Sequence, residues 1–277
     1  MSTLDRRIIE RIRPRQPDWL RTFYRYRVAL LTLLRREVVR FTRIWVQTLL
    51  PPVITMSLYF LIFGNLIGQR VGEMHGVPYV VYIAPGLIMM AIITNSYANV
   101  VSSFFGAKFQ RSIEEILVAP VPNSILLAGF IGGGMARGLA VGVLVTIMAT
   151  FFAGLSMHSM GVTVAIVILT AALFSLGGFI NGIYAKSFDD TSLIPTFVLT
   201  PLTYLGGVFY SVDMLPEIPR AISYLNPILY MVNAFRYGLI GQSDIHPALA
   251  LAVTALLVVV MTWFCLWLLE RGVGIRN

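Results

Sequence analysis

Long apolar stretches, separated by short polar segments, run through most of the chain. Six of them lie at about 44–67, 79–105, 124–152, 162–184, 191–210 and 248–269. Each has at least the ~20 residues that a helix needs to cross the hydrocarbon core of a bilayer. The pattern therefore predicts an all-α membrane protein with six transmembrane helices.

Residues 18–43 have the periodicity of an amphipathic helix. Apolar side chains recur every three or four positions, and arginines fill much of the rest. The apolar set is Phe23, Tyr26, Leu30, Leu34, Val38 and Phe41, and the basic set is Arg21, Arg25, Arg35, Arg36, Arg40 and Arg43. Because this segment continues directly into the first predicted span, we interpret it as an N-terminal interfacial helix among lipid headgroups. The alternative is an ordinary soluble amphipathic helix.

A second amphipathic segment interrupts the apolar pattern at 106–122. Its charged residues stand at helical spacing, with apolar residues on the opposite side and two prolines at the end. They are Lys108, Arg111, Glu114 and Glu115, then Phe109, Ile113, Ile116 and Leu117, and finally Pro120 and Pro122. Two interpretations are open: a docking surface for a soluble partner, or an interfacial helix that only turns the chain between two spans.

The segment 211–246 is apolar but contains prolines, Asn226, Asn233 and Arg236. The distribution of basic residues decides its interpretation. With the N-terminus inside, segments 1–43, 106–123, 185–190 and 270–277 hold 17 of the 21 Lys and Arg residues, and the opposite side holds three. Six spans therefore satisfy the positive-inside rule, with both termini cytoplasmic. We predict a basic cytoplasmic segment at 1–43, a transmembrane domain at 44–270 with outer re-entrant half-helices at 211–246, and a cytoplasmic tail at 271–277.

The net charge of +8 does not indicate a nucleic-acid partner. Hydrophobic residues make up 57% of the chain and charged residues 12%, about half the charged share of a soluble domain. Twelve of the 21 basic residues lie before residue 44, so the charge is concentrated at one end of a membrane protein. There it faces membrane lipids or sets topology.

The residues offer no catalytic or metal-binding set. The two lysines, Lys108 and Lys186, each follow alanine, so the Walker A motif is absent and we expect no ATP hydrolysis by this chain itself. The three histidines, His75, His158 and His246, fall on three separate predicted loops, a spacing more typical of solvated loop residues than of a metal site. Gly134, Gly138 and Gly142 stand four apart, which favours close helix packing over ligand binding.

Arg137 is the one charge well inside a predicted span. Such a charge costs roughly 3 kcal/mol on insertion scales and therefore needs a partner or water. The candidate partners are Glu114, Glu115, Asp189 and Asp190. A switch or pathway role and a structural pair are both open. For Asp189 and Asp190 themselves, helix capping is the favoured role.

Polar and aromatic residues on two predicted spans are candidates for a transport path. They are Asn95, Tyr97 and Asn99 on the second span, and Phe197, Thr200 and Tyr204 on the fifth. A mixed polar and aromatic lining suits an amphipathic or lipid-like substrate, but a polysaccharide path would also need aromatic residues, so composition does not separate these two substrate classes. The alternative for each polar residue is a hydrogen bond between packed helices.

Several segments together resemble the ABC-2 type transporter permeases, close to the YadH-like subgroup. They are RIWVQTLLPPVITMSLYFLIFG at 43–64, GAKFQRSIEEILVAPVPNSILLAGFIGGGMARG at 106–138, KSFDD at 186–190, PTFVLTPLTYLGGVFYSVDMLP at 195–216 and LNPILYMVNAFRYG at 225–238. The resemblance covers about residues 40–277. The N-terminal extension is the least similar part.

The resemblance implies a half-transporter of the bacterial inner membrane. It would form a homodimer and bind a separate ATP-binding subunit, giving a 2:2 complex in which ATP and Mg²⁺ bind the partner. Residues 106–118 would be the family's cytoplasmic coupling helix, which contacts the ATPase through Phe109, Gln110, Arg111, Ile113, Glu114, Glu115 and Leu117. The outer half-helices would cover the exit. A self-sufficient secondary transporter and a membrane scaffold are the competing hypotheses, although no acidic residue for ion coupling falls inside a predicted span.

Overall fold

The computed structural model describes residues 18–113 and 121–274 of the 277-residue chain. The expectations for 1–17, for Glu114, Glu115 and Leu117, and for the last three residues fall outside this described part. The described part is mostly helical, as the sequence predicts for an all-α membrane protein. It also has one β-hairpin, whose two strands have two residues each.

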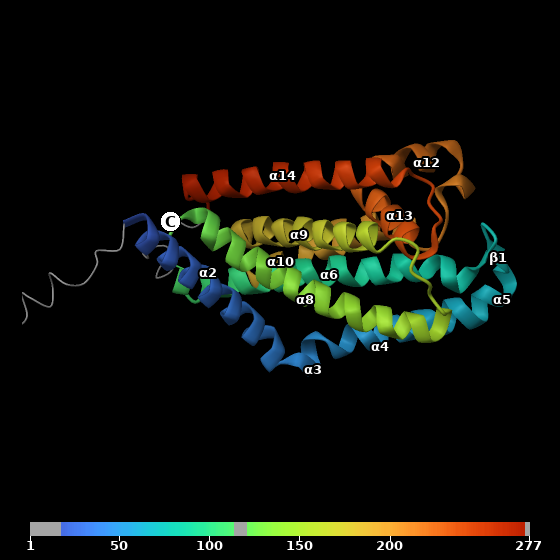
Figure 1. The fold of residues 1–277 in the computed structure, drawn as a ribbon, viewed down its shortest axis with the longest axis horizontal. Coiled ribbons are helices and arrows are strands. Elements are labelled where there is room, and N and C mark those ends of the chain that lie inside the picture. Colours follow the sequence, from blue (N-terminus) through green and yellow to red (C-terminus); the bar gives the residue numbers. More distant parts are fainter. Residues whose placement is uncertain (1–17, 114–120, 275–277) are drawn as a thin grey trace, which may run out of the picture.

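The helices follow one another along the chain with short connections (Figure 1). The first half contains α2 (Asp18–Arg43), α3 (Trp45–Thr48), α4 (Leu50–Tyr59), the π-helix η1 (Phe60–Ile67), α5 (Gly68–Val71), β1 (Glu73–Met74), β2 (Val77–Pro78) and α6 (Tyr79–Phe109). The second half contains α8 (Asn123–Ala153), α9 (Met160–Tyr184), α10 (Phe188–Ile194), the π-helix η2 (Pro195–Leu199), α11 (Thr200–Tyr204), the 3-10 helix η3 (Val212–Met214), α12 (Glu217–Tyr224), α13 (Pro227–Ile240) and α14 (Pro247–Arg271).

Five helical stretches in the described part are long and apolar enough to cross a membrane. They are Trp45–Val71, Tyr79–Phe109, Asn123–Ala153, Met160–Tyr184 and Pro247–Arg271. The predicted fifth span forms a shorter helical run, from Phe188 in α10 to Tyr204 in α11, and the chain then turns. Its predicted end at residue 210 is therefore wrong, and the count of six spans stays a prediction.

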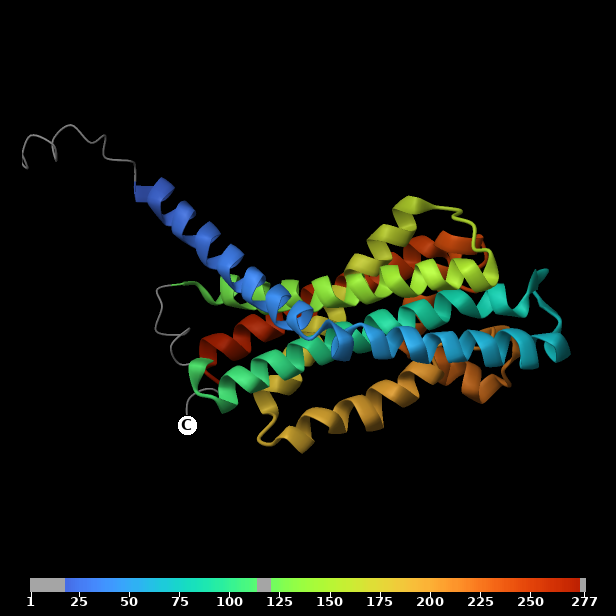
Figure 2. The same cartoon turned by 90° about the horizontal axis from the view of Figure 1, so that it is seen from below.

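The successive helices run in alternating directions, so the connections gather at two ends (Figures 1 and 2). One end holds α2, the end of α6, the start of α10 and the end of α14; we call it the α2 end. The other holds the β-hairpin, α12, α13 and the start of α14; we call it the α13 end. Helix α2 extends obliquely from the bundle at its own end (Figure 2).

Helix α6 lies at the centre of the bundle and packs against α8, α9 and α13. Of its most apolar window, 78% is buried, whereas 12% of the first stretch and 17% of the last are. A helix that is apolar on all sides is typical of such an interior position. In contrast, the first and last stretches present apolar side chains outward, as helices facing lipid or another chain do.

One expectation about a helix boundary needs correction. The predicted second span ends at residue 105, but α6 continues without a break to Phe109, so residues 106–109 are its last turn rather than the start of a new helix. In the first membrane-length stretch, the helical backbone breaks at Leu49, just ahead of Pro51 and Pro52. The two prolines lie in the first turn of α4, where a missing N–H costs nothing.

Candidate functional site

The end of α6 is fixed to the end of α9 by one lysine. Lys108 Nζ donates to the backbone carbonyls of Ile183, at 2.6 Å, and Ala185, at 3.0 Å. Carbonyls at the end of a helix lack intrahelical donors, and a cation there also complements the helix dipole.

Three phenylalanines connect the same turn to the start of α10. The ring centroid of Phe188 lies 5.0 Å from those of both Phe105 and Phe109, with its plane edge-on to each. Such edge-to-face pairs are favourable beyond the area they bury. The last turn of α6 therefore contacts α9 through Lys108 and α10 through Phe109.

The predicted coupling residues divide between surface and interior. Phe109, Gln110 and Arg111 are exposed, and Ile113 is buried. Arg111 has φ of 59°, in the left-handed region, and its N–H donates to the carbonyl of Lys108 at 3.0 Å, which ends α6. Their contact with an ATPase stays a prediction.

A buried carboxylate joins α2 to α6. Glu37 is 1% exposed and accepts a hydrogen bond from Ser103 at 2.6 Å. Arg36 pairs with it at 3.1 Å and Arg40 at 3.3 Å. Arg40 reaches further, donating to the carbonyl and the side-chain oxygen of Asn99 at 2.9 and 3.0 Å. Sequence reasoning missed Glu37; a lone acid inside an arginine-rich helix was the only signal.

Among the described residues, Arg137 pairs with an amide and with no acid; Glu114 and Glu115, two of its predicted partners, lie outside them. Arg137 Nη2 donates to Asn95 Oδ1 at 3.2 Å and, more weakly, to the carbonyl of Thr48 at 3.4 Å. The expected aspartate partner is therefore wrong for the described residues: Asp190 instead accepts from the backbone N–H groups of Lys186 and Ser187 and caps α10. The sequence had named Asn95, but for a different role.

The predicted path residues separate into two groups. Asn95, Tyr97 and Asn99 are all buried inside the single chain, where Asn95 and Asn99 hydrogen-bond to arginines from α8 and α2. Phe197, Thr200 and Tyr204 lie on the exposed side of η2 and α11. Within one chain, these two groups of residues do not come together. The burial of Asn95 and Asn99 fits their alternative interpretation, which is hydrogen bonding between packed helices. Their transport role stays a prediction.

The glycines of α8 allow close approach on two sides. A Cβ added at Gly134 would meet Ser175 and Val100, and one added at Gly138 would meet Ser96. A Cβ added at Gly142 would lie 2.7 Å from Cγ1 of Ile92. On the other side of α8, Gly129, Gly132 and Gly133 contact the α2 residues Leu33, Leu34 and Glu37.

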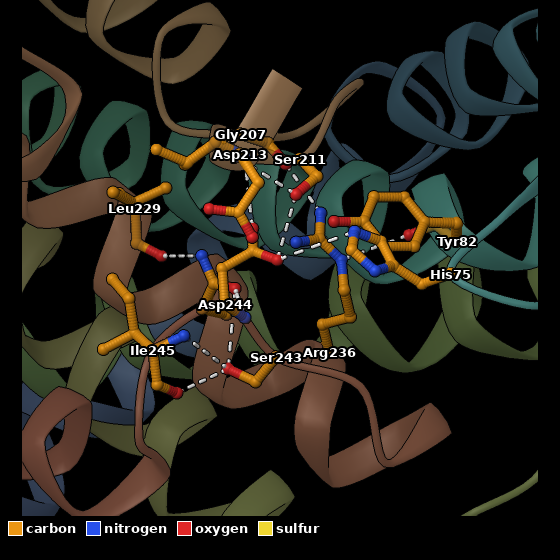
Figure 3. Close-up of polar contacts among 12 residues, drawn as sticks. His75, Tyr82, Gly207, Ser211, Asp213, Leu229, Arg236, Ser243, Asp244 and Ile245 are labelled. Atoms are coloured by element: carbon orange, nitrogen blue, oxygen red, sulfur yellow. Dashed lines mark hydrogen bonds and ion pairs between the residues drawn. The ribbon is translucent and has the colours of Figure 1, made fainter. Parts of the chain in front are cut away.

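At the α13 end, a fully buried arginine ties three segments together (Figure 3). Arg236 of α13 donates to the carbonyl of Gly207 at 2.6 Å and to that of Tyr82, in α6, at 3.3 Å. Its guanidinium carbon also lies 4.1 Å from the Tyr82 ring centroid, a cation–π contact. The sequence had counted this residue as an outer basic residue, without indicating its burial.

Asp244 organises the polar loop beside Arg236 (Figure 3). It accepts from Ser211 Oγ at 3.0 Å and from the N–H of Val212 at 3.2 Å. Its own N–H donates to Asn233 at 2.9 Å. His75, predicted to be a solvated loop residue, has its Nε2 4.0 Å from Asp244 Oδ1 and stacks on Tyr82. These contacts hold α13 against the β-hairpin and the 205–212 turn.

The described residues hold no group of three or more His, Cys, Asp or Glu side chains placed to bind a metal. The polar clusters described above, at the two ends of α6, hold neighbouring helices against that helix.

Comparisons with known proteins agree with this architecture. The family model of the ABC-2 type transporter matches residues 28–240. The chain is 57% identical over 252 residues to the inner membrane transport permease YadH of Escherichia coli (strain K12), covering 91% of this chain and 98% of that protein. It is 24% identical over 216 residues to nodulation protein J of Sinorhizobium fredii (strain NBRC 101917 / NGR234), covering 78% and 82%. The chain belongs to the ABC-2 type transporter family.

Proposed function

We propose that this chain is the membrane-spanning permease subunit of an ATP-driven exporter in the bacterial inner membrane. A separate ATP-binding subunit supplies ATP hydrolysis, with ATP and Mg²⁺ bound there, and two copies of each chain form a 2:2 complex. Family membership, the apolar helices and a relative named as an inner membrane transport permease support this proposal. The concentration of basic residues in the N-terminal segment supports a cytoplasmic location of the α2 end.

The observation that carries the proposal is that the last turn of α6 contacts two other helices, α9 and α10. A partner that presses on the segment from residue 106 to residue 118 moves the end of α6, and with it α9 through Lys108 and α10 through Phe109. Helix α6 then reaches the α13 end, where Tyr82 holds Arg236. A rigid, buried helix with fixed contacts at both ends transmits such a displacement.

The exposed apolar residues support a second copy of the chain. Ile54 and Leu58 are exposed on the first stretch, and Phe197 and Val198 on η2. Two copies paired along these helices enclose Phe197, Thr200 and Tyr204, the exposed path candidates. A path of aromatic and hydroxyl groups suits a hydrophobic or amphipathic substrate.

The test is co-purification. The tagged chain is expressed with its adjacent ATP-binding subunit and purified into nanodiscs, and the mass of the complex and its vanadate-sensitive ATPase activity are measured. A 2:2 complex with such activity is the expected result. Transport by vesicles that contain this chain alone contradicts the proposal and favours a secondary transporter. A partner that binds without hydrolysing ATP favours a scaffold.

A further inference from the structure

A cleft of about 1140 Å³ opens at the α2 end between α2, the last turns of α6 and Phe188. That is the size of a small-molecule binding site. Its floor is formed by Ser102, Ser103 and Gly106 of α6, and one wall by α2. Phe188, which contacts Phe109 of the last turn of α6, is one of its lining residues.

The cleft is strongly positive. Arg35, Arg36, Arg40 and Arg43 line it together with a single carboxylate, Glu37. Among the described lining residues, one carboxylate against four guanidinium groups leaves three positive charges in excess. Glu114 and Glu115, which follow the lining residue Ser112 in the sequence, lie outside the described part. Within residues 18–113 and 121–274, no carboxylate pairs with Arg35 or Arg43, and both side chains are exposed.

The network around Glu37 pre-arranges one side of the cleft. Arg40 is held by Glu37, by both oxygens of Asn99 and, at 3.4 Å, by Ser102. The carboxylate of Glu37 already accepts hydrogen bonds from Ser103, Arg36 and Arg40, so it does not pair with the other arginines of the cleft. A fixed guanidinium beside two unpaired ones is suited to an anion with several oxygens, such as a phosphate.

The rim of the cleft is apolar. Val39, Ile44 and Phe188 line it, and their side chains are 51%, 44% and 59% exposed. Arg43 directly precedes the start of the first membrane-length stretch at Trp45, so the arginines lie at the level of lipid headgroups. The occupant must therefore combine a negative headgroup with an apolar tail.

We infer that this cleft binds the phosphate headgroup of an anionic phospholipid of the inner leaflet, with an acyl chain along Val39 and Ile44. Phosphatidylglycerol has this chemistry, and phosphatidylcholine is the matched lipid without net charge. Arg35 and Arg43 supply the unpaired charge, and Arg40 supplies a fixed donor. This inference does not depend on the proposed ATP-driven function.

The test measures lipid binding to the full-length, delipidated chain in neutral detergent by native mass spectrometry. The chain should bind phosphatidylglycerol in preference to phosphatidylcholine with the same acyl chains. Changing Arg35→Gln together with Arg43→Gln should weaken phosphatidylglycerol binding roughly thirtyfold, since each charge near the membrane surface contributes about five- to sixfold. Arg25→Gln with Arg27→Gln is the matched control, because it removes the same charge from exposed positions of α2 outside the cleft.

Two further arms separate the alternatives. Arg35→Lys with Arg43→Lys keeps the charge and should retain most of the binding, which excludes a folding defect as the cause. Glycerol 3-phosphate, which has the headgroup chemistry without the tail, should not displace the lipid. Displacement by this soluble phosphate overturns the lipid assignment, and so does an equal loss of binding in the Arg25 and Arg27 variant or the absence of any preference for phosphatidylglycerol. None of these measurements involves the ATP-binding subunit, so their failure leaves the proposed function standing.

Discussion

The guanidinium carbon of Arg236 lies over the ring of Tyr82, 4.1 Å from its centroid, which places a buried charge of α13 on the central helix α6. The same group donates to the backbone carbonyls of Tyr82 and Gly207. An arginine can make such a stacked and forked contact, whereas a lysine carries only a point charge. The pair therefore fixes α13, the 205–212 turn and α6 relative to one another.

Replacing Arg236 should destabilise the protein. Arg236→Ala removes the donor to the carbonyls of Gly207 and Tyr82 and opens a cavity, so we expect the free energy of unfolding to fall by about 3 kcal/mol. Arg236→Lys should recover less than half of this. The measurement is thermal unfolding in detergent. Arg70→Ala, at an exposed arginine of the same end, is the control and should change stability by less than about 0.5 kcal/mol; equal effects at both positions would refute the assigned role of Arg236.

The Glu37 network should behave as one coupled unit. Glu37→Gln removes the charge that Arg36, Arg40 and Ser103 contact, and we expect a loss of about 2 kcal/mol in stability. In a double-mutant cycle, Glu37→Gln and Ser103→Ala should show a coupling energy of about 1 kcal/mol. Glu73→Gln, an exposed acid at the other end, should change little. Strict additivity of the two substitutions would show that the 2.6 Å contact is unimportant.

Larger side chains in place of the α8 glycines that face α6 should destabilise the protein. An added Cβ at Gly138 clashes first with the Ser96 hydroxyl and lies 3.2 Å from the carbonyl of Ile92. We expect Gly138→Val to cost about 2 kcal/mol or more. Combining Gly138→Ala with Ser96→Ala should be milder than Gly138→Ala alone. Gly161→Ala, which meets nothing within 4 Å, is the control and should be neutral in the same unfolding assay.

The start of α10 should be sensitive to acid. Backbone hydrogen bonds from Lys186 and Ser187 lower the pKa of Asp190 below its ordinary value near 4. Because the pKa of Asp190 is lower in the folded state than in the unfolded state, its carboxylate stabilises the folded state at pH values above the unfolded pKa. This contribution disappears as the pH falls through the folded pKa. Protection of the 186–194 amides from hydrogen exchange, corrected for intrinsic rates, should therefore decline at acid pH. Asp190→Asn should remove this dependence, and Asp189→Asn should leave it intact.

The sequence predicted the helices well and their polar contacts poorly. The length of the apolar stretches predicts the five membrane-length helices, and the recurrence of apolar residues every three or four positions predicts α2. Both properties depend on local sequence alone. The end of α6 was misplaced because Gly106 and the charged Lys108 interrupt the apolar pattern, yet the helix continues to Phe109 and contacts α9 and α10. The partner of Arg137 was missed because the pairing with Asn95 depends on how α8 and α6 are rotated against each other. Likewise, the burial of Glu37 and Arg236 follows from packing between elements distant in the sequence.

The central claim is that motion driven by ATP enters at the last turn of α6 and reaches the α13 end. Spin labels at Ile218→Cys, on the exposed face of α12, would measure the distance between the two copies in the complex with its ATP-binding subunit. The single native cysteine, Cys265, is buried and does not interfere.

We expect the label distance to shift between the nucleotide-free and the vanadate-trapped states. Lys108→Met with Phe109→Ala should abolish the shift while ATP hydrolysis continues, because the contacts to Ile183 and Phe188 are lost. Phe151→Ala, at a phenylalanine that is 87% exposed, should leave the shift unchanged. A full shift in the Lys108 and Phe109 variant would contradict the claim that the end of α6 transmits the motion.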